Sequence, residues 1–366
     1  MSSRKARVAV VGTGWWATTA HIPALRQNPD AELVALCDRS PEALARAMAA
    51  FGPVATYTDL GAMLAAEKLD GAIVATNHTS HYALAKACLE AGLHVLLEKP
   101  MVLRAAHAHE LTALAQAQGR ELIIGYPYHF TELTRRARQV LSSGELGAIQ
   151  FVSCLMASMV IEFYRGNDQA YAPQFGYPVT GPGRAYADPQ LSGGGQGHLQ
   201  VTHLAGSLFY ITGLQAERVS AFMENGDVAV DLVDAISVRF AAANGQRAVG
   251  VLGSTGNIGV GDGGHTEVAV YCENGYLNLD QGHGTLLVRR HDGSEERHGP
   301  LSATDRYPSF ATSRNLVDVI LGKSENGSPG TVGTRVVELL EAAYRSADQG
   351  GAPIGVAELL DSAQTT

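Results

Sequence analysis

The chain has 366 residues, of which 46% are hydrophobic and 17% charged, so it can bury large cores and is not a disordered protein. At roughly 150 residues per domain, this length predicts two domains. There are 27 Lys and Arg residues against 36 Asp and Glu, a net charge of −9 with no basic block, which argues against nucleic acids and anionic membranes as partners. No apolar run approaches the roughly 18 residues that span a bilayer.

Residues 6–126 alternate between apolar strand patterns and helical patterns. Strands are predicted at residues 7–12, 32–38, 71–76, 94–100 and 121–126, with helices near 15–28, 41–51, 59–67, 79–91 and 103–118. Continuous apolar strands that alternate with helices are typical of a parallel sheet covered on both faces. We therefore predict an α/β, doubly wound Rossmann domain over residues 1–126.

The pattern changes in the second half of the chain. After a helix near 131–143, strands are predicted at 148–158, 217–224, 235–241, 247–254, 266–272, 275–280 and 285–290, with helices at 196–212, 309–321 and 331–348. Consecutive strands joined by Gly, Asn and Asp turns indicate a mostly antiparallel sheet. Residues 127–366 are therefore predicted to form an α+β domain that binds substrate and mediates oligomerisation.

Four cysteines, Cys37, Cys88, Cys154 and Cys272, are widely spaced and form no zinc or disulfide pattern. The apolar run at residues 8–11 is shorter than the roughly seven residues of a signal-peptide core. These features favour a cytoplasmic protein, and no metal site is predicted.

A glycine-rich turn follows the first predicted strand. Gly12-Thr13-Gly14-Trp15-Trp16-Ala17 matches G-x-G-x-x-G/A, in which the two glycines allow a tight turn and close approach to a pyrophosphate. The helix that begins here would offer N–H groups to the phosphates. The sequence therefore predicts a dinucleotide site; the alternative is an ordinary glycine turn.

The second predicted strand ends in Asp38. A carboxylate there would accept hydrogen bonds from both ribose hydroxyls and repel a 2′-phosphate, which favours NAD. Arg39 could instead hold the 2′-phosphate of NADP, so NADP remains an alternative cofactor.

Taken with Glu98-Lys99-Pro100 and the glycine run before residue 196, the fingerprint resembles the Gfo/Idh/MocA family of nicotinamide-dependent sugar and polyol oxidoreductases. The resemblance covers nearly the whole chain. It implies that Lys99 acts at the substrate carbinol, that Pro100 follows a cis peptide, and that Glu98 lies near the nicotinamide ribose. The remaining residues that it places beside the cofactor lie at the end of the 71–76 strand and just after it: Thr76, Asn77 and His81.

A lysine suits this chemistry, because oxidising an alcohol needs a base for the hydroxyl proton. Desolvation would lower the pKa of Lys99 toward the range of a useful base. The alternative is a lysine that extends from a strand end into solvent.

The predicted helix 196–212 supplies a second group. Gln196, Gln200 and His203 share one helical face, so the glutamines could bind sugar hydroxyls while His203 assists proton transfer; a buried structural histidine is the alternative. The resemblance places an aspartate where this chain has Leu199, so the usual lysine–aspartate–histidine relay is in question. Tyr126 is a further candidate substrate ligand.

Residues 161–192 lack periodicity and are rich in aromatic side chains. Long loops in compact domains are often functional. We expect a substrate lid or an arm from a neighbouring subunit, and a loop packed for stability is the alternative.

These features predict an NAD-dependent dehydrogenase of sugars, glycosides or cyclic polyols that forms a homodimer or homotetramer. Two alternatives stay open: a redox-neutral enzyme that retains its NAD, and a non-catalytic regulator that binds a dinucleotide.

Overall fold

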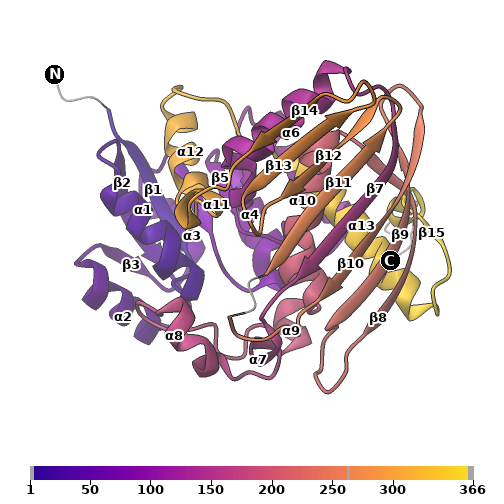
Figure 1. Cartoon of the computed structure of the whole chain (residues 1–366). Coiled ribbons are helices and arrows are strands. Elements are labelled where there is room, and N and C mark those ends of the chain that lie inside the picture. The colour runs from indigo at the N-terminus through magenta and orange to yellow at the C-terminus, as the bar shows by residue number, and fades with distance from the viewer. Residues whose placement is uncertain (1–3, 262–263, 362–366) are drawn as a thin grey trace.

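The computed structural model describes residues 4–261 and 264–361, and its two sheets lie side by side (Figure 1). The first sheet is parallel, with strand order β3-β2-β1-β4-β5-β6. Its strands are β1 (Ala6–Val11), β2 (Ala31–Cys37), β3 (Ala55–Tyr57), β4 (Gly71–Val74), β5 (His94–Leu97) and β6 (Leu122–Ile124). This is the doubly wound Rossmann order, so the predicted fold class of the first half is confirmed. The short strand β3 escaped prediction.

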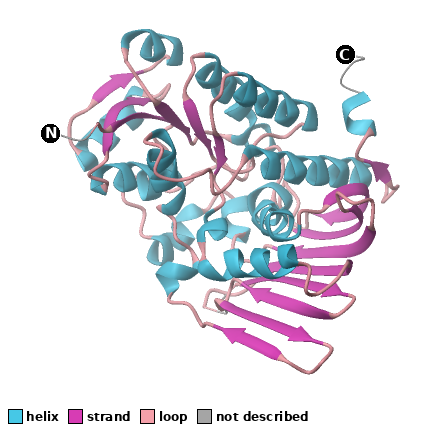
Figure 2. Ribbon diagram, turned by 90° about the horizontal axis from the view of Figure 1, so that it is seen from above, coloured by secondary structure: helices cyan, strands magenta, loops and turns pink. Residues whose placement is uncertain are grey.

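Helices cover both faces of the parallel sheet (Figure 2). They are α1 (Ile22–Gln27), α2 (Pro41–Phe51), α3 (Leu60–Ala66), α4 (His81–Glu90) and α5 (Ala105–Ala117). The ends of α2 illustrate how sequence sets these bounds. Ser40 caps its N-terminus by accepting a hydrogen bond from the Ala43 N–H, and Gly52 ends it with a φ of +86°.

The second sheet has the order β14-β13-β12-β11-β7-β10-β9-β8-β15 and is antiparallel except where β7 pairs with β10. Its strands are β7 (Ile149–Ala157), β8 (Gln215–Glu224), β9 (Val233–Ala241), β10 (Arg247–Thr255), β11 (His265–Cys272), β12 (Gly275–Asp280), β13 (Thr285–Arg290), β14 (Glu295–His298) and β15 (Ile354–Gly355). The predicted mostly antiparallel sheet is confirmed, with β14 and β15 as additional edge strands.

The remaining helices follow residue 126 in the chain. They are α6 (Glu132–Ser143), α7 (Ile161–Tyr164), α8 (Ala172–Phe175), α9 (Pro189–Ser192), α10 (Thr202–Thr212), α11 (Ala303–Arg306), α12 (Ala311–Ile320), α13 (Gly330–Asp348) and α14 (Glu358–Asp361). The segment expected to lack periodicity, 161–192, thus contains short helical turns joined by loops, the longest of them over residues 176–188. Among the described residues, no helix is long and apolar enough to cross a membrane.

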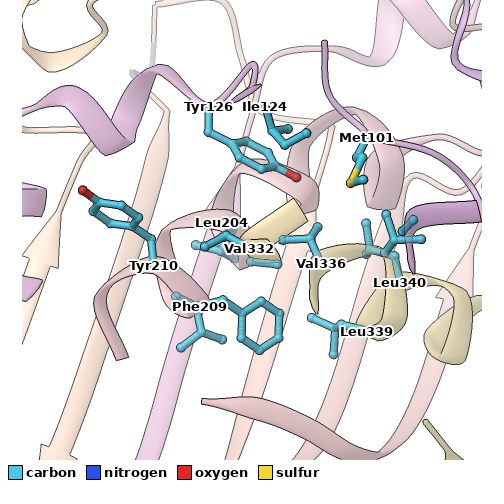
Figure 3. Close-up of a cluster of buried hydrophobic side chains, with 14 of the residues drawn as sticks. Met101, Ile124, Tyr126, Leu204, Phe209, Tyr210, Val332, Val336, Leu339 and Leu340 are labelled. Carbon is cyan, nitrogen blue, oxygen red and sulfur yellow. The ribbon is translucent and has the colours of Figure 1, made fainter. Parts of the chain in front are cut away.

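One core joins the two halves. In Figure 3, side chains that follow or end the parallel sheet meet α10 and α13; those labelled are Met101, Ile124, Tyr126, Leu204, Phe209, Tyr210, Val332, Val336, Leu339 and Leu340. A second core lies on the other face of the parallel sheet, where Leu316 and Val317 of α12 pack with Val8 and Ile73. A helix far beyond residue 126 therefore completes the Rossmann half, and a boundary at that residue stays a prediction.

Candidate active site

A cavity of about 970 Å³ opens at the carboxyl edge of the parallel sheet and reaches the second half of the chain. This is where doubly wound folds bind ligands, because loops diverge there on either side of the sheet. Its wall includes the glycine loop after β1, the loops after β2, β4 and β5, the 160–186 segment and the turn before α10.

The glycine loop is shaped for close approach to a ligand. Gly12 has a φ of +91°, and a Cβ there would lie 2.3 Å from the Ala75 carbonyl oxygen, so no other residue fits. A Cβ on Gly14, by contrast, would have no atom within 4 Å. The chain thus leaves open space where the fingerprint needs room for a pyrophosphate, and the loop fits a bound dinucleotide.

Asp38 follows β2 and lines the cavity, as does the exposed Arg39. The Thr13 N–H and hydroxyl both donate to Asp38 Oδ2, at 2.8 and 3.0 Å, and the Ser40 N–H donates to Oδ1. Asp38 therefore shapes the glycine loop while lining the cofactor end of the cavity. Thr13 is buried behind that wall instead of lining the cavity.

The loop after β4 places Thr76 and Asn77 on the cavity wall. His81 lies behind the wall, fully buried, with Nδ1 2.8 Å from the Pro100 carbonyl oxygen and Nε2 3.1 Å from that of Thr76. The expected contact between His81 and the cofactor is therefore not what the structure shows. Both ring nitrogens are engaged by backbone, so His81 ties the two loops together.

Lys99 and Glu98 follow β5 and line the cavity. Burial lowers the pKa of Lys99 to about 8, and the nearby Glu98 opposes part of that shift. One Glu98 oxygen lies 3.0 Å from His21 Nε2 and the other accepts the Lys99 N–H, which fixes the carboxylate. The Lys99–Pro100 peptide is cis.

The Lys99 amine donates to the backbone carbonyl oxygen of Leu199 at 3.0 Å. Leu199 lies in a π-helical turn, Gly197–Val201, directly before α10. A π-turn shifts the helical hydrogen-bond register and so frees a carbonyl, a distortion common at functional sites. The Leu199 side chain is buried in an apolar cluster. Where the resemblance places an aspartate, a peptide oxygen thus contacts the lysine.

His203 and Gln200 line the cavity beside Lys99. Burial, and then the charge of Lys99, hold the pKa of His203 well below its usual range, so its ring is neutral. Its Nδ1 is buried and has no hydrogen-bond partner among the described residues. Lys99, Gln200 and His203 all line this cavity, where they can bind a hydroxyl and exchange its proton.

Two other predicted substrate ligands are not on the wall. Gln196 is fully buried; its amide NH₂ donates to the Ser158 hydroxyl, and its amide oxygen accepts from the Tyr164 hydroxyl. The expectation that Gln196 contacts a sugar is therefore wrong. Tyr126 is likewise buried and lies 3.1 Å from the Thr202 hydroxyl. Shared helical spacing placed Gln196 with His203, but the π-turn between them rotates that face.

Aromatic rings form two clusters on the cavity wall. Trp15 packs against Phe163, Phe175 and Tyr186 of the 161–192 segment, with ring centroids 5.3, 5.5 and 6.4 Å away. In the second cluster Trp16 contacts Tyr307, which contacts Tyr128, which contacts His203. Within the chain itself, the 161–192 segment therefore covers part of the cavity.

The wall residues that sequence reasoning missed include His78, Tyr128 and Tyr307. His78 lies in the loop that contains the predicted cofactor residues Asn77 and His81, so its position in the sequence was a signal that could have identified it. Tyr307 joins the site through the tertiary fold, more than 200 residues from Lys99, and carries no local signal. Among the described residues, no group of three or more His, Cys, Asp or Glu could hold a metal.

Comparisons with known proteins agree with this geometry. The sequence model described as "Oxidoreductase family, NAD-binding Rossmann fold" matches residues 6–126, and that of the "GFO/IDH/MocA C-terminal domain" matches residues 134–278. A D-glucoside 3-dehydrogenase of Escherichia coli is 35% identical over 150 residues, 41% of this chain and 42% of that protein. A 1-carboxy-3-chloro-3,4-dihydroxycyclohexa-1,5-diene dehydrogenase of Comamonas testosteroni is 31% identical over 146 residues, 40% of this chain and 36% of that protein.

The matched stretches thus span well under half of these relatives. A solved structure, GenD2 from gentamicin A biosynthesis in complex with NAD, covers 97% of both chains with a TM-score of 0.75 at 24% identity, which shows a shared fold. With family models matching both halves of the sequence, this chain belongs to the Gfo/Idh/MocA family of oxidoreductases and has its NAD-binding Rossmann fold.

Proposed function

We propose that this protein is an NAD-dependent dehydrogenase that oxidises a secondary hydroxyl of an uncharged sugar, glycoside or cyclic polyol. The observation that carries the proposal is Lys99, a half-buried lysine on the cavity wall with a pKa lowered to about 8 and its amine held by the Leu199 carbonyl. Perturbed lysines in clefts are typical of proton-transfer sites.

In this mechanism the neutral Lys99 amine accepts the substrate hydroxyl proton. NAD+, when bound, supplies the hydride acceptor. Neutral His203 lies beside the amine and hydrogen-bonds the substrate, and Gln200 offers an amide to a neighbouring hydroxyl. Gly14 and the start of the following helix would hold the pyrophosphate, with Asp38 at the adenosine ribose.

The charge of the cavity wall supports an uncharged substrate. Among the residues that the structure describes, Arg39 and Lys99 are the lysines and arginines on that wall, and Arg39 lies at the Asp38 end. A phosphorylated or carboxylated sugar at Lys99 would therefore lack a second cation. Aromatic faces from Tyr128, Tyr186 and Tyr307 suit the apolar faces of a sugar ring or an aryl aglycone, and a glucoside dehydrogenase is among the relatives.

We also infer a homodimer or homotetramer through the outer face of the nine-stranded sheet. Exposed apolar side chains gather on its central strands: Phe151 and Leu155 on β7, Val249 and Val251 on β10, and Tyr271 on β11, with Val249 and Tyr271 both in register with Phe151. Such a patch is unusual on a monomer. Light scattering should give a multiple of 38.6 kDa, and Val249→Lys should lower that mass.

The test of the activity is absorbance at 340 nm with NAD+ or NADP+ against free sugars, inositols and aryl glycosides. We expect a rise with one substrate class, and a fall in kcat of at least about 100-fold in Lys99→Ala with unchanged NADH affinity. A flat trace from protein without bound dinucleotide, or an active Lys99→Ala variant, would contradict the proposal. Retained cofactor with no net absorbance change would instead favour the redox-neutral reaction.

A further inference from the structure

His78 is a wall residue with no role in the mechanism so far. It begins the 3₁₀ turn His78–Ser80 after β4 and is 6% exposed. His78 lines the same cavity as Lys99 and His203, and its ring contacts that of Tyr186 at a centroid distance of 5.8 Å.

The hydrogen bond of His78 fixes its tautomer. Nδ1 lies 2.8 Å from the carbonyl oxygen of Ser192, 114 residues away at the end of α9. A carbonyl can only accept, so Nδ1 carries the proton. Burial, and then the neighbouring His81 and Lys99, hold the pKa of His78 well below its usual value, so the ring is neutral. Nε2 therefore presents a lone pair.

The other histidines near the site differ from His78. His81 has both ring nitrogens at backbone carbonyls, and His198 stacks on Tyr344 away from the cavity wall. His203 lines the cavity, but no hydrogen bond to its Nδ1 sets its tautomer. His78 is thus the wall histidine whose backbone contact predetermines an acceptor.

We propose that His78 Nε2 is a fixed hydrogen-bond acceptor for a substrate hydroxyl next to the one that Lys99 deprotonates. This inference rests on the proposed function. Lys99 takes a proton from one oxygen, and His78 selects ligands with a second hydroxyl donor within reach, so that it determines specificity for a diol. Its anchor Ser192 and its ring partner Tyr186 both belong to the segment that covers the cavity, which favours substrate over the cofactor ribose as the donor.

Two variants separate the anchor from the acceptor. His78→Asn keeps a donor near the Nδ1 position for Ser192 but has no acceptor at the Nε2 position. His78→Gln can place an amide oxygen near Nε2. Titration calorimetry of phenyl β-D-glucopyranoside into NADH-saturated protein should show about 10-fold weaker binding in His78→Asn and near-native binding in His78→Gln. NADH affinity, from its fluorescence, should change less than 2-fold.

The 2-, 3- and 4-deoxy analogues of that glycoside identify the donor. One of them should bind His78→Asn and the unaltered protein equally, because its missing hydroxyl is the one that His78 contacts. Weaker NADH binding with unchanged glycoside binding would place His78 at the cofactor ribose and overturn the proposal, as would equal binding of every glycoside to both proteins.

The premise can be tested without a sugar. Nitrogen-15 NMR of the histidine rings should report the Nδ1–H tautomer for His78 at neutral pH, and an Nε2–H form would overturn the inference. Failure of the dehydrogenase proposal is distinct, because it would show as absent NAD+ reduction while these binding measurements are unaffected. If neither phenyl glucoside nor any sugar of the activity panel binds the NADH-saturated protein, the assignment to a substrate is overturned.

Discussion

Two glycine-rich turns border the cavity, and they differ in whether a ligand can reach their backbone N–H groups. In each, a loop leads into a helix that contains a π-turn, at Ala17–His21 and at Gly197–Val201. In the first loop, Asp38 receives the Thr13 N–H, and the space beside Gly14 is open. That loop can therefore receive an anion.

In the second loop the chain itself takes up the N–H groups. Asp231 accepts from Gly195 and Gly197 at 2.6 and 2.7 Å, its carbonyl accepts from Gln196, and the Ser192 hydroxyl accepts from Gly194. The second loop thus has no donors for a phosphate, and it offers a carbonyl to Lys99 instead. Similar glycine runs can build an anion site or an acceptor, depending on which carboxylate reaches them.

Two glycine substitutions should break this comparison most strongly. Gly14→Val points into open space, so we expect NADH to bind about 100-fold more weakly, because the side chain fills the pyrophosphate position, with thermal stability nearly unchanged. Gly195→Ala would place a Cβ 2.1 Å from the Asp231 carbonyl oxygen, and it should cost about 3 kcal/mol or more of unfolding free energy. NADH fluorescence and denaturant unfolding measure the two effects. Equal losses of stability in both variants would contradict the contrast between an open first loop and a closely packed second loop.

Asp231→Asn tests the carboxylate of the second loop. The buried Asp231 accepts two N–H groups and the Tyr344 hydroxyl, whereas an amide would turn one NH₂ toward a donor. We expect a loss of about 2 kcal/mol in unfolding free energy, measured by denaturant titration. Asp38→Asn, the matched change in the first loop, should lower NADH affinity with a smaller loss of stability. A larger loss of stability in Asp38→Asn than in Asp231→Asn would contradict this difference between the two loops.

Leu199→Asp sharpens the contrast at Lys99. Only the neutral amine accepts a proton, so kcat/KM for oxidation should rise with pH through about 8 and level off above it. A carboxylate beside the amine favours its charged form, so the profile should move to higher pH by about 1 unit. Leu199→Asn, which adds polarity without charge, should move it less. A profile unmoved by Leu199→Asp would mean that Lys99 does not set it.

Arg39→Ala should have the smallest effect. Arg39 is exposed at the Asp38 end of the cavity, so its removal should weaken NADPH binding by a few fold and leave NADH binding nearly unchanged. Fluorescence titration with both cofactors measures this. A larger loss for NADH than for NADPH would contradict the placement of Arg39 at the 2′-phosphate.

The sequence by itself determined the parts that depend on local patterns. Continuous apolar runs that alternate with helical patterns predicted the parallel sheet, and consecutive strands joined by Gly, Asn and Asp turns predicted the antiparallel one. The Gly12–Ala17 fingerprint with Asp38 predicted the dinucleotide end. A family resemblance pointed to Lys99. These features are local because a strand, a turn and a helix start are set by neighbouring residues.

Only the tertiary structure decided which side chains face the cavity. The π-turn at Gly197–Val201 rotated Gln196 into the core and left the Leu199 carbonyl to Lys99. A hydrogen bond across 114 residues set the tautomer of His78, and long-range packing brought Tyr307 to the wall. Spacing along a chain assumes regular helices and says nothing of distant partners, so contacts that arise from a helix irregularity or from packing between halves appear only once the chain has folded.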